Sequence, residues 1–272
     1  IFFNIFVILF IVLFYKINII HVRSRAPAWS CYFVSKLLGV SLISTFHGTY
    51  NFNNSLKKFY NSVMLRGNSV IAGSRFIFDH IRNNYNYSKE IFLIPRGINI
   101  DYFNSKNSNI EGLNSVRTRW GISGNNFLIL LPGRLTFWKG QFLFLNTLLF
   151  LKQENLLNNI SAIILGDDQG RTEYREYLLD FIREHRLEEN VKIISHESFM
   201  PSAYNACDLV LSASIEPEAF GRVAVEAQAM EKPILASNIG GSNETIIDGQ
   251  TGWLFKSDDE KDLAKMIIEI SK

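Results

Sequence analysis

The chain has 272 residues, a length that suggests two domains or one large one. Its residues are 47% hydrophobic and 20% charged, a composition that builds sizeable cores and excludes a disordered chain. The formal net charge of +2 and the scattered Lys and Arg residues exclude the strongly basic class of nucleic-acid-binding proteins. The two cysteines lie far apart and the five histidines lack ligand spacing, so we expect no metal site and favour a reduced, cytoplasmic setting.

The first segment, residues 1–15, is almost wholly apolar and is broken only by Asn4. A membrane helix needs about 20 apolar residues and a signal peptide needs a basic leader, and the segment has neither. It therefore favours a core helix of a soluble domain over a membrane-associated segment. Because the chain opens inside this helical pattern and without Met, we expect it to be a fragment.

Short apolar strands then recur, each followed by a polar turn and a helical pattern. The predicted strands are residues 19–22, 42–46, 69–72, 91–95, 127–131, 162–165, 191–194, 209–212 and 233–236, with a short last strand ending near 255. This alternation predicts an α/β protein with parallel sheets covered by helices on both faces. The polar stretch 103–119 reads as a linker, which gives two doubly wound, Rossmann-like domains at residues 1–108 and 109–272. Ligands of such folds bind at the loops that follow the strands.

The loop after strand 127–131 has the composition of a phosphate cradle. Gly133 allows a tight turn, Arg134 offers a planar fork of donors, Lys139 offers a point charge, and a helix begins at about Gln141. The order Gly-Lys-Ser/Thr and the pattern GxGxxG are both absent, which argues against P-loop kinases and dinucleotide dehydrogenases. The alternative is an ordinary loop with an exposed Arg and Lys.

Two carboxylates flank the loop and helix that follow strand 209–212. Glu218 lies in the strand-to-helix loop, Glu226 lies inside the helix, and the helix begins between them near Gly221. A helix N-terminus suits a phosphate, so two hydroxyl-binding carboxylates around it describe a receptor for a sugar–diphosphate–ribose. The alternative is helix capping and solvation. Further along, Gly240-Gly241 permits either close approach of backbone to a ligand or a plain tight turn.

Together these motifs resemble the retaining nucleotide-sugar glycosyltransferases of the GT-B fold, family 4 (glycosyl transferases group 1). The resemblance covers roughly residues 128–255, in the family's order and spacing. It rests on Gly133-Arg134 with Lys139-Gly140, on Ala206-Cys207-Asp208, on Glu218, Phe220, Gly221 and Glu226, and on Gly240-Gly241, Glu244, Gly249 and Gly252.

The resemblance implies a role for each matching residue. Arg134 and Lys139 would bind the donor diphosphate, Glu218 would hold the sugar hydroxyls with backbone N–H groups of Phe220 and Gly221, and Glu226 would hold the ribose. Gly133 and His196 complete the expected donor site, with the base near residues 196–199. In the first half, His47 follows a strand and is expected to join the catalytic group that Arg134, Lys139 and Glu218 form, although a lone His is more often structural. The acceptor-side domain is expected to be incomplete.

The implied reaction moves a hexose from a UDP- or GDP-linked donor to a hydroxyl of a glycan or glycolipid, with retention. Lipopolysaccharide or cell-surface polysaccharide assembly is the expected setting, without a cofactor and without a required metal. Alternatives are a GT-B phosphorylase or epimerase, or a nucleotide-sugar-binding module without transferase activity. Lys57, Lys58, Phe59 and Tyr60 suggest a peripheral contact with the inner face of the cytoplasmic membrane, against the simpler reading of a solvated helix.

Overall fold

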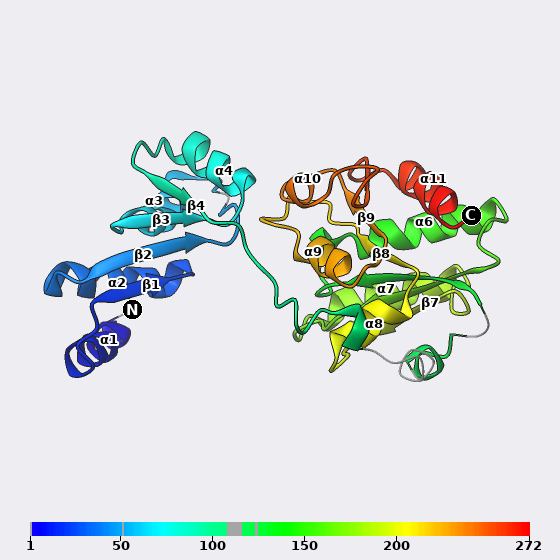
Figure 1. Cartoon of the computed structure of the whole chain (residues 1–272), viewed down its shortest axis with the longest axis horizontal. Helices are drawn as coiled ribbons and strands as arrows, with labels where there is room; N and C mark the ends of the chain where they lie inside the picture. Colours follow the sequence, from blue (N-terminus) through cyan, green and yellow to red (C-terminus); the bar gives the residue numbers. More distant parts are fainter. Residues whose placement is uncertain (1, 51, 108–115, 123–124) are drawn as a thin grey trace. The chain divides into compact units, whose positions relative to one another are not determined.

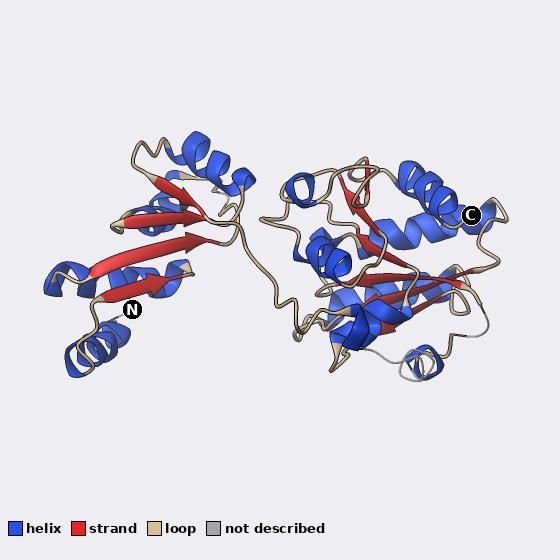
Figure 2. Ribbon diagram, viewed as in Figure 1, coloured by secondary structure: helices blue, strands red, loops and turns tan. Residues whose placement is uncertain are grey.

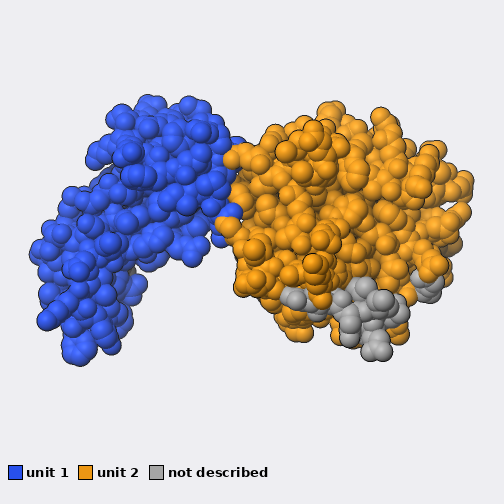
Figure 3. All heavy atoms as spheres, viewed as in Figure 1, with its two compact units in different colours: residues 1–96 blue, residues 97–272 orange. Residues whose placement is uncertain are grey.

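The computed structural model describes residues 2–50, 52–107, 116–122 and 125–272. The chain divides into two compact units, Ile1–Arg96 and Gly97–Lys272, which are coloured separately in Figure 3. We describe each unit on its own.

Unit 1 is a four-stranded parallel sheet with the strand order β1-β2-β3-β4 (Figure 1). Its buried core includes Phe46, Val70, Ile77 and Ile81. Ser74 starts α4, because its hydroxyl accepts a hydrogen bond from the backbone N–H of Ile77 at 3.1 Å. The elements are α1 (Phe2–Phe14), β1 (Ile19–Val22), α2 (Arg25–Leu38), β2 (Ser41–Phe46), α3 (Ser55–Asn61), η1 (Ser62–Leu65), β3 (Ser69–Ala72), α4 (Arg75–Tyr85) and β4 (Ile91–Leu93).

Unit 2 is a six-stranded parallel sheet with the order β10-β9-β8-β5-β6-β7. Figure 2 shows its strands in red and its helices in blue. One core lies between the sheet and α6, α7 and α11, and a second lies on the side of α8 and α9, so helices cover both faces. The elements are η2 (Ser105–Asn107), β5 (Phe127–Pro132), η3 (Phe137–Lys139), α6 (Gln141–Gln153), β6 (Ile160–Leu165), α7 (Thr172–Glu184), β7 (Val191–Ile194), α8 (Met200–Ala206), β8 (Leu209–Ser212), α9 (Arg222–Ala229), β9 (Ile234–Ser237), α10 (Ser242–Thr245), β10 (Trp253–Phe255) and α11 (Glu260–Ile270).

The strand order of unit 2 reverses between β5 and β8. The chain runs outward from β5 through β6 to β7, and then returns to pair β8 with the other edge of β5. In doubly wound sheets a ligand binds outside the carboxyl ends of the two strands at such a switch point. The loops that follow β5 and β8 are those in which the sequence places the phosphate cradle and Glu218.

All ten predicted strands are present, with ends that move by one or two residues. The first segment forms the predicted helix, but the prediction of a core helix is wrong in this structure. Among the described side chains of α1 Val12 is buried, whereas Phe2, Phe6, Phe10 and Phe14 are exposed. In the described part of the chain, no helix has the length and apolarity needed to cross a membrane.

The polar stretch predicted as a linker begins inside unit 2. The Tyr102 ring lies 5.4 Å from that of Phe199, and the Phe103 ring lies 5.8 Å from that of Tyr204 on α8. Residues 97–107 therefore pack with the second unit, and the compact units divide at Arg96 instead of the predicted residue 108. The boundary differs because Tyr102 and Phe103 pack on the second unit, although most of the residues around them in the sequence are polar.

Candidate donor-binding site

The loop after β5 is held by backbone contacts to its neighbours. The Gly133 N–H donates to the Leu165 carbonyl at 2.9 Å, which ties the loop to the end of β6. The carbonyl of Arg134 accepts a hydrogen bond from the side-chain amide of Gln141, a fully buried residue at the start of α6. This fixes the Arg134 backbone while its side chain remains exposed to solvent.

The loops after β5 and β8 pack directly against each other. A Cβ at Gly140 would meet the Ala213 carbonyl oxygen at 1.8 Å, so only glycine allows this approach. The Ile215 N–H donates to the Trp138 carbonyl at 2.9 Å. Residues 137–140 and 213–215 therefore form one rigid corner at the switch point.

Lys139 and Glu218 meet at this corner. The Lys139 Nζ lies 2.6 Å from the Glu218 Oε1, and the two side chains are only 13% and 11% exposed. The same Oε1 accepts a hydrogen bond from the hydroxyl of Ser214, directly after β8. The ammonium also lies over the Trp138 ring, 4.4 Å from its centroid. The structure thus brings into contact two residues that the sequence analysis assigns to one donor site.

Gly240 and Gly241 support the loop that carries Glu218. A Cβ at Gly240 would meet the Glu218 carbonyl oxygen at 2.7 Å, and a Cβ at Gly241 would meet the backbone of Phe220 at 2.5 Å. The Gly241 N–H also donates to the Glu218 carbonyl at 2.8 Å. The paired glycines thus allow close approach of two protein backbones, where the sequence suggested approach to a ligand or a tight turn.

The start of α9 completes the corner. Phe220 and Gly221 are buried, and Gly221 precedes α9 with a left-handed φ of 77°. The first N–H groups of a helix lack partners inside the helix and carry its positive dipole end. The helix that the sequence predicts to bind an anion therefore begins at Arg222, four residues after Glu218.

Glu226 has different neighbours from Glu218. It is buried in α9, where its Oε2 accepts from the Tyr204 hydroxyl at 2.7 Å and its Oε1 pairs with Arg222 Nη2 at 2.7 Å. Burial and the adjacent carboxylate raise the pKa of Tyr204 well above 10, so the hydroxyl stays protonated and donates. The structure thus fixes the Glu226 side chain from α8 and from its own helix.

Of the two predicted histidines, His196 belongs to unit 2 and His47 to unit 1. His196 follows β7 and is exposed. His47 follows β2 in unit 1, where its Nε2 accepts a hydrogen bond from Arg23 Nε at 2.8 Å. Burial, with the charges of Arg96 and Arg23, lowers the pKa of His47 to about 4. The ring is therefore neutral and carries its proton on Nδ1.

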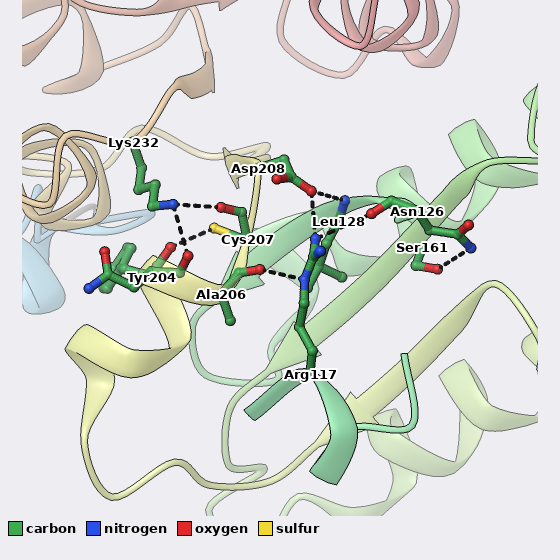
Figure 4. A network of polar contacts seen from close by, with 10 residues as sticks. Arg117, Asn126, Leu128, Ser161, Tyr204, Ala206, Cys207, Asp208 and Lys232 are labelled. Atoms are coloured by element: carbon green, nitrogen blue, oxygen red, sulfur yellow. Dashed lines mark hydrogen bonds and ion pairs between the residues drawn. The ribbon is translucent and has the colours of Figure 1, made fainter. Parts of the chain in front are cut away.

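Asp208 of the motif Ala206-Cys207-Asp208 lies at the opposite end of β8 and makes structural contacts (Figure 4). Its Oδ2 accepts from Arg117 Nη2 at 2.6 Å and from the Leu128 N–H at 2.7 Å. Arg117 also donates to the Ala206 carbonyl at 2.9 Å. The aspartate fastens the amino ends of β5 and β8 to the helical residues 116–119.

Sequence reasoning missed Ser214, Gln141 and Tyr204. The position of Ser214, four residues before Glu218 and at the end of a strand, is a signal that was available. Gln141 lies seven residues after Arg134, at the end of the loop that the sequence singled out, but nothing in the sequence marks its amide as the partner of the Arg134 carbonyl. Tyr204 acts through Glu226, 22 residues away, and no spacing marks that pair. Across the described residues, no group of three or more His, Cys, Asp or Glu side chains is placed to hold a metal ion.

Comparison with known families decides the assignment. Residues 114–272 match the family Glycosyl transferases group 1, and residues 1–102 match Glycosyltransferase Family 4. This chain belongs to the group 1 glycosyl transferases. The family and the GT-B fold that the motifs implied are therefore confirmed.

Solved structures and curated relatives agree with this membership. A glycosyltransferase from Rickettsia africae superposes with a TM-score of 0.87 at 37% identity, over 98% of this chain and 70% of that one. Anabaena Alr3699/HepE in complex with UDP-glucose gives 0.82 at 25% identity, over 93% and 68%. The lipopolysaccharide 1,2-N-acetylglucosaminetransferase of Salmonella typhimurium is 32% identical over 144 residues, 51% of this chain and 37% of that protein. The chain spans less than half the length of the curated relatives it matches.

Proposed function

We propose that this glycosyltransferase moves a hexose from a nucleoside-diphosphate sugar, UDP- or GDP-linked, to a hydroxyl acceptor with retention of configuration. The observation that carries the proposal is the Lys139–Glu218 pair, held at the β5–β8 switch point beside the start of α9. It places a cation, a carboxylate and a helix N-terminus around one corner, which matches a diphosphate bonded to a sugar.

Each residue then has a distinct task. Lys139 and Arg134 stabilise the negative charge that develops on the departing diphosphate, together with the N–H groups at the start of α9. Glu218 accepts hydrogen bonds from the sugar hydroxyls, and Ser214 and Lys139 hold its carboxylate in place. Glu226, oriented by Tyr204, binds the ribose hydroxyls. These cations supply the charge stabilisation without a required metal ion.

The relatives narrow the first donor and acceptor to test. The complex of the Anabaena protein with UDP-glucose supports a UDP-linked hexose, and the Salmonella relative supports an acceptor in lipopolysaccharide or another surface polysaccharide. The two free cysteines, Cys31 and Cys207, are buried, which supports a cytoplasmic setting.

The test measures donor hydrolysis and transfer by the full-length protein with UDP-glucose and UDP-N-acetylglucosamine. Lys139→Ala and Glu218→Gln should each lower kcat about 100-fold or more, because each removes a group that contacts the reacting donor. Lys265→Ala, on the exposed side of α11, is the matched control and should keep wild-type kcat. Wild-type rates in both site variants would refute the assignment, and NMR of the new glycosidic bond decides whether configuration is retained.

Calorimetry separates the enzyme from a binding module. Tight donor binding without turnover in the full-length protein, across a panel of glycan acceptors, would favour the module. Turnover that disappears in Glu218→Gln while the fold persists supports the transferase.

A further inference from the structure

The two units carry opposite charge. Residues 1–96 contain eleven Lys and Arg against two acidic residues, Asp79 and Glu90, a formal charge of +9. Residues 97–272 contain 17 Lys and Arg against 24 Asp and Glu, a formal charge of −7. The net charge of +2 for the whole chain conceals this division.

Three of the cations of unit 1 line one cavity of about 260 Å³. Lys36 comes from the last turn of α2, Arg66 from the turn before β3, and Lys89 from the turn before β4. These are the amino ends of the strands, so the cavity lies at the opposite edge of the sheet from His47, which follows β2. None of the described residues that line it is acidic.

The wall of the cavity is fixed by hydrogen bonds. The Asn68 side chain accepts from the Leu42 N–H at 2.9 Å, and the Ser35 hydroxyl donates to the Val40 carbonyl at 2.6 Å. Both residues line the cavity, and both are tied to β2 or to the turn before it. The three cations are therefore presented by a rigid frame.

An aromatic face adjoins this cavity through Arg66. The Arg66 guanidinium lies 5.1 Å from the centroid of the Trp29 ring and 4.8 Å from that of Phe59. On α2, Trp29, Phe33 and Leu37 follow one another at four-residue intervals and so lie on one side of the helix. Phe33 is 48% exposed and Leu37 is 69% exposed. A cationic cavity and an exposed apolar stripe thus share one edge of unit 1.

We propose that this edge docks on a bilayer that contains anionic phospholipid. Lys36, Arg66 and Lys89 bind the lipid phosphate in the cavity, while Phe33 and Leu37 enter the interfacial layer. Two observations fit this occupant: the cations are not balanced by acidic residues lining the cavity, and the apolar side chains are exposed beside them. Aromatic rings together with basic residues favour the headgroup region of a bilayer. Phe59, which the sequence suggested as a membrane contact, packs on Trp29 within the same face.

The first experiment removes two cations, Lys36 and Lys89, whose side chains are exposed and whose loss should leave the fold intact. Lys36→Gln with Lys89→Gln should bind vesicles of phosphatidylcholine with phosphatidylglycerol about 30-fold more weakly than the wild type in co-sedimentation, which corresponds to about 2 kcal/mol at roughly 1 kcal/mol for each basic residue. Lys261→Gln with Lys265→Gln on α11 changes the net charge equally and is the matched control, which should keep wild-type binding. Equal losses in both double variants would overturn the proposal, because binding would then follow net charge alone.

The second experiment tests the apolar stripe. Leu37→Ser should weaken binding to the same vesicles about tenfold, and Leu156→Ser, at a half-exposed site of unit 2, should leave it unchanged. Inorganic phosphate, titrated by NMR, separates the two sources of phosphate. If the lysine variant loses phosphate binding but the wild type does not bind the anionic vesicles, the cavity is a site for a soluble anion and the membrane proposal is wrong. Binding to pure phosphatidylcholine as tight as to anionic vesicles would overturn it as well.

Discussion

At the scale of single residues, His47 shows how a neighbour sets a protonation state. Arg23 donates to the His47 Nε2, so the neutral ring must carry its proton on Nδ1. The Nδ1 atom is buried and has no hydrogen-bond partner among the described residues. A positive ring would face Arg23, Arg96 and His21. His47 therefore does not act as a base while Arg23 donates to its Nε2.

This arrangement makes the stability of the protein depend on pH in a defined window. The unfolded chain takes up a proton at His47 near pH 6.5, whereas the folded chain does so at about 4. Stability is therefore full above pH 6.5 and falls as the pH drops from 6.5 to 4, by about 1–2 kcal/mol once the partial exposure of the ring is allowed for. Urea unfolding at a series of pH values should show this loss in the wild type and not in His47→Gln.

His196→Gln is the control for this measurement, since its ring is exposed, and it should keep the wild-type pH dependence. If the free energy of unfolding changed with pH equally in the wild type and in His47→Gln between pH 4 and 6.5, the lowered pKa of His47 would be contradicted.

At the scale of elements, the strands were predictable and their order was not. Each strand is a short apolar run bounded by turns, a local signal that the sequence displays directly. The contact of Lys139 with Glu218, 79 residues apart, exists because β8 returns to pair with β5, and local patterns do not specify that pairing. The sequence therefore predicted both residues from their motifs, but missed Ser214 between them and the structural role of Asp208.

Asp208 gives a prediction for this scale. Asp208→Ala removes the acceptor that joins Arg117 to the Leu128 backbone, and it should lower the free energy of unfolding by about 2 kcal/mol. Asp180→Ala breaks an exposed ion pair with Arg183 and should cost less than about 1 kcal/mol. Denaturant unfolding of the two variants measures the difference in the free energy of unfolding. Equal losses would show that the contacts of Asp208 stabilise the fold no more than an exposed ion pair does.

At the scale of the whole molecule, each unit has its own core and its own charge. The two cores of unit 2 are built wholly from residues of that unit, including Phe103 of its first segment. The sequence placed the boundary at residue 108 because the surrounding stretch is polar, and it could not show that Tyr102 and Phe103 pack on α8 and the residue before it.

Two fragments compare the observed division with the predicted one. Residues 97–272 should fold cooperatively by themselves and bind an anion exchanger at neutral pH, in keeping with a formal charge of −7. Residues 109–272 lack the buried Phe103 and should be less stable by about 3 kcal/mol. Thermal and urea unfolding measure this difference, and equal stability would favour the predicted boundary.

The packing of Gly240 and Gly241 on the loop of Glu218 has a consequence for how this protein evolves. A side chain at Gly240 or Gly241 would clash with the backbone of Glu218 or Phe220. The loop after β9 and the loop after β8 should therefore change together during evolution. Insertions or larger residues at this contact would displace the Glu218 carboxylate. Because Glu218 is proposed to hold the donor sugar, new donor preferences should arise by exchange of side chains around this contact, and comparison of paralogues with different donors should find loop length constant here.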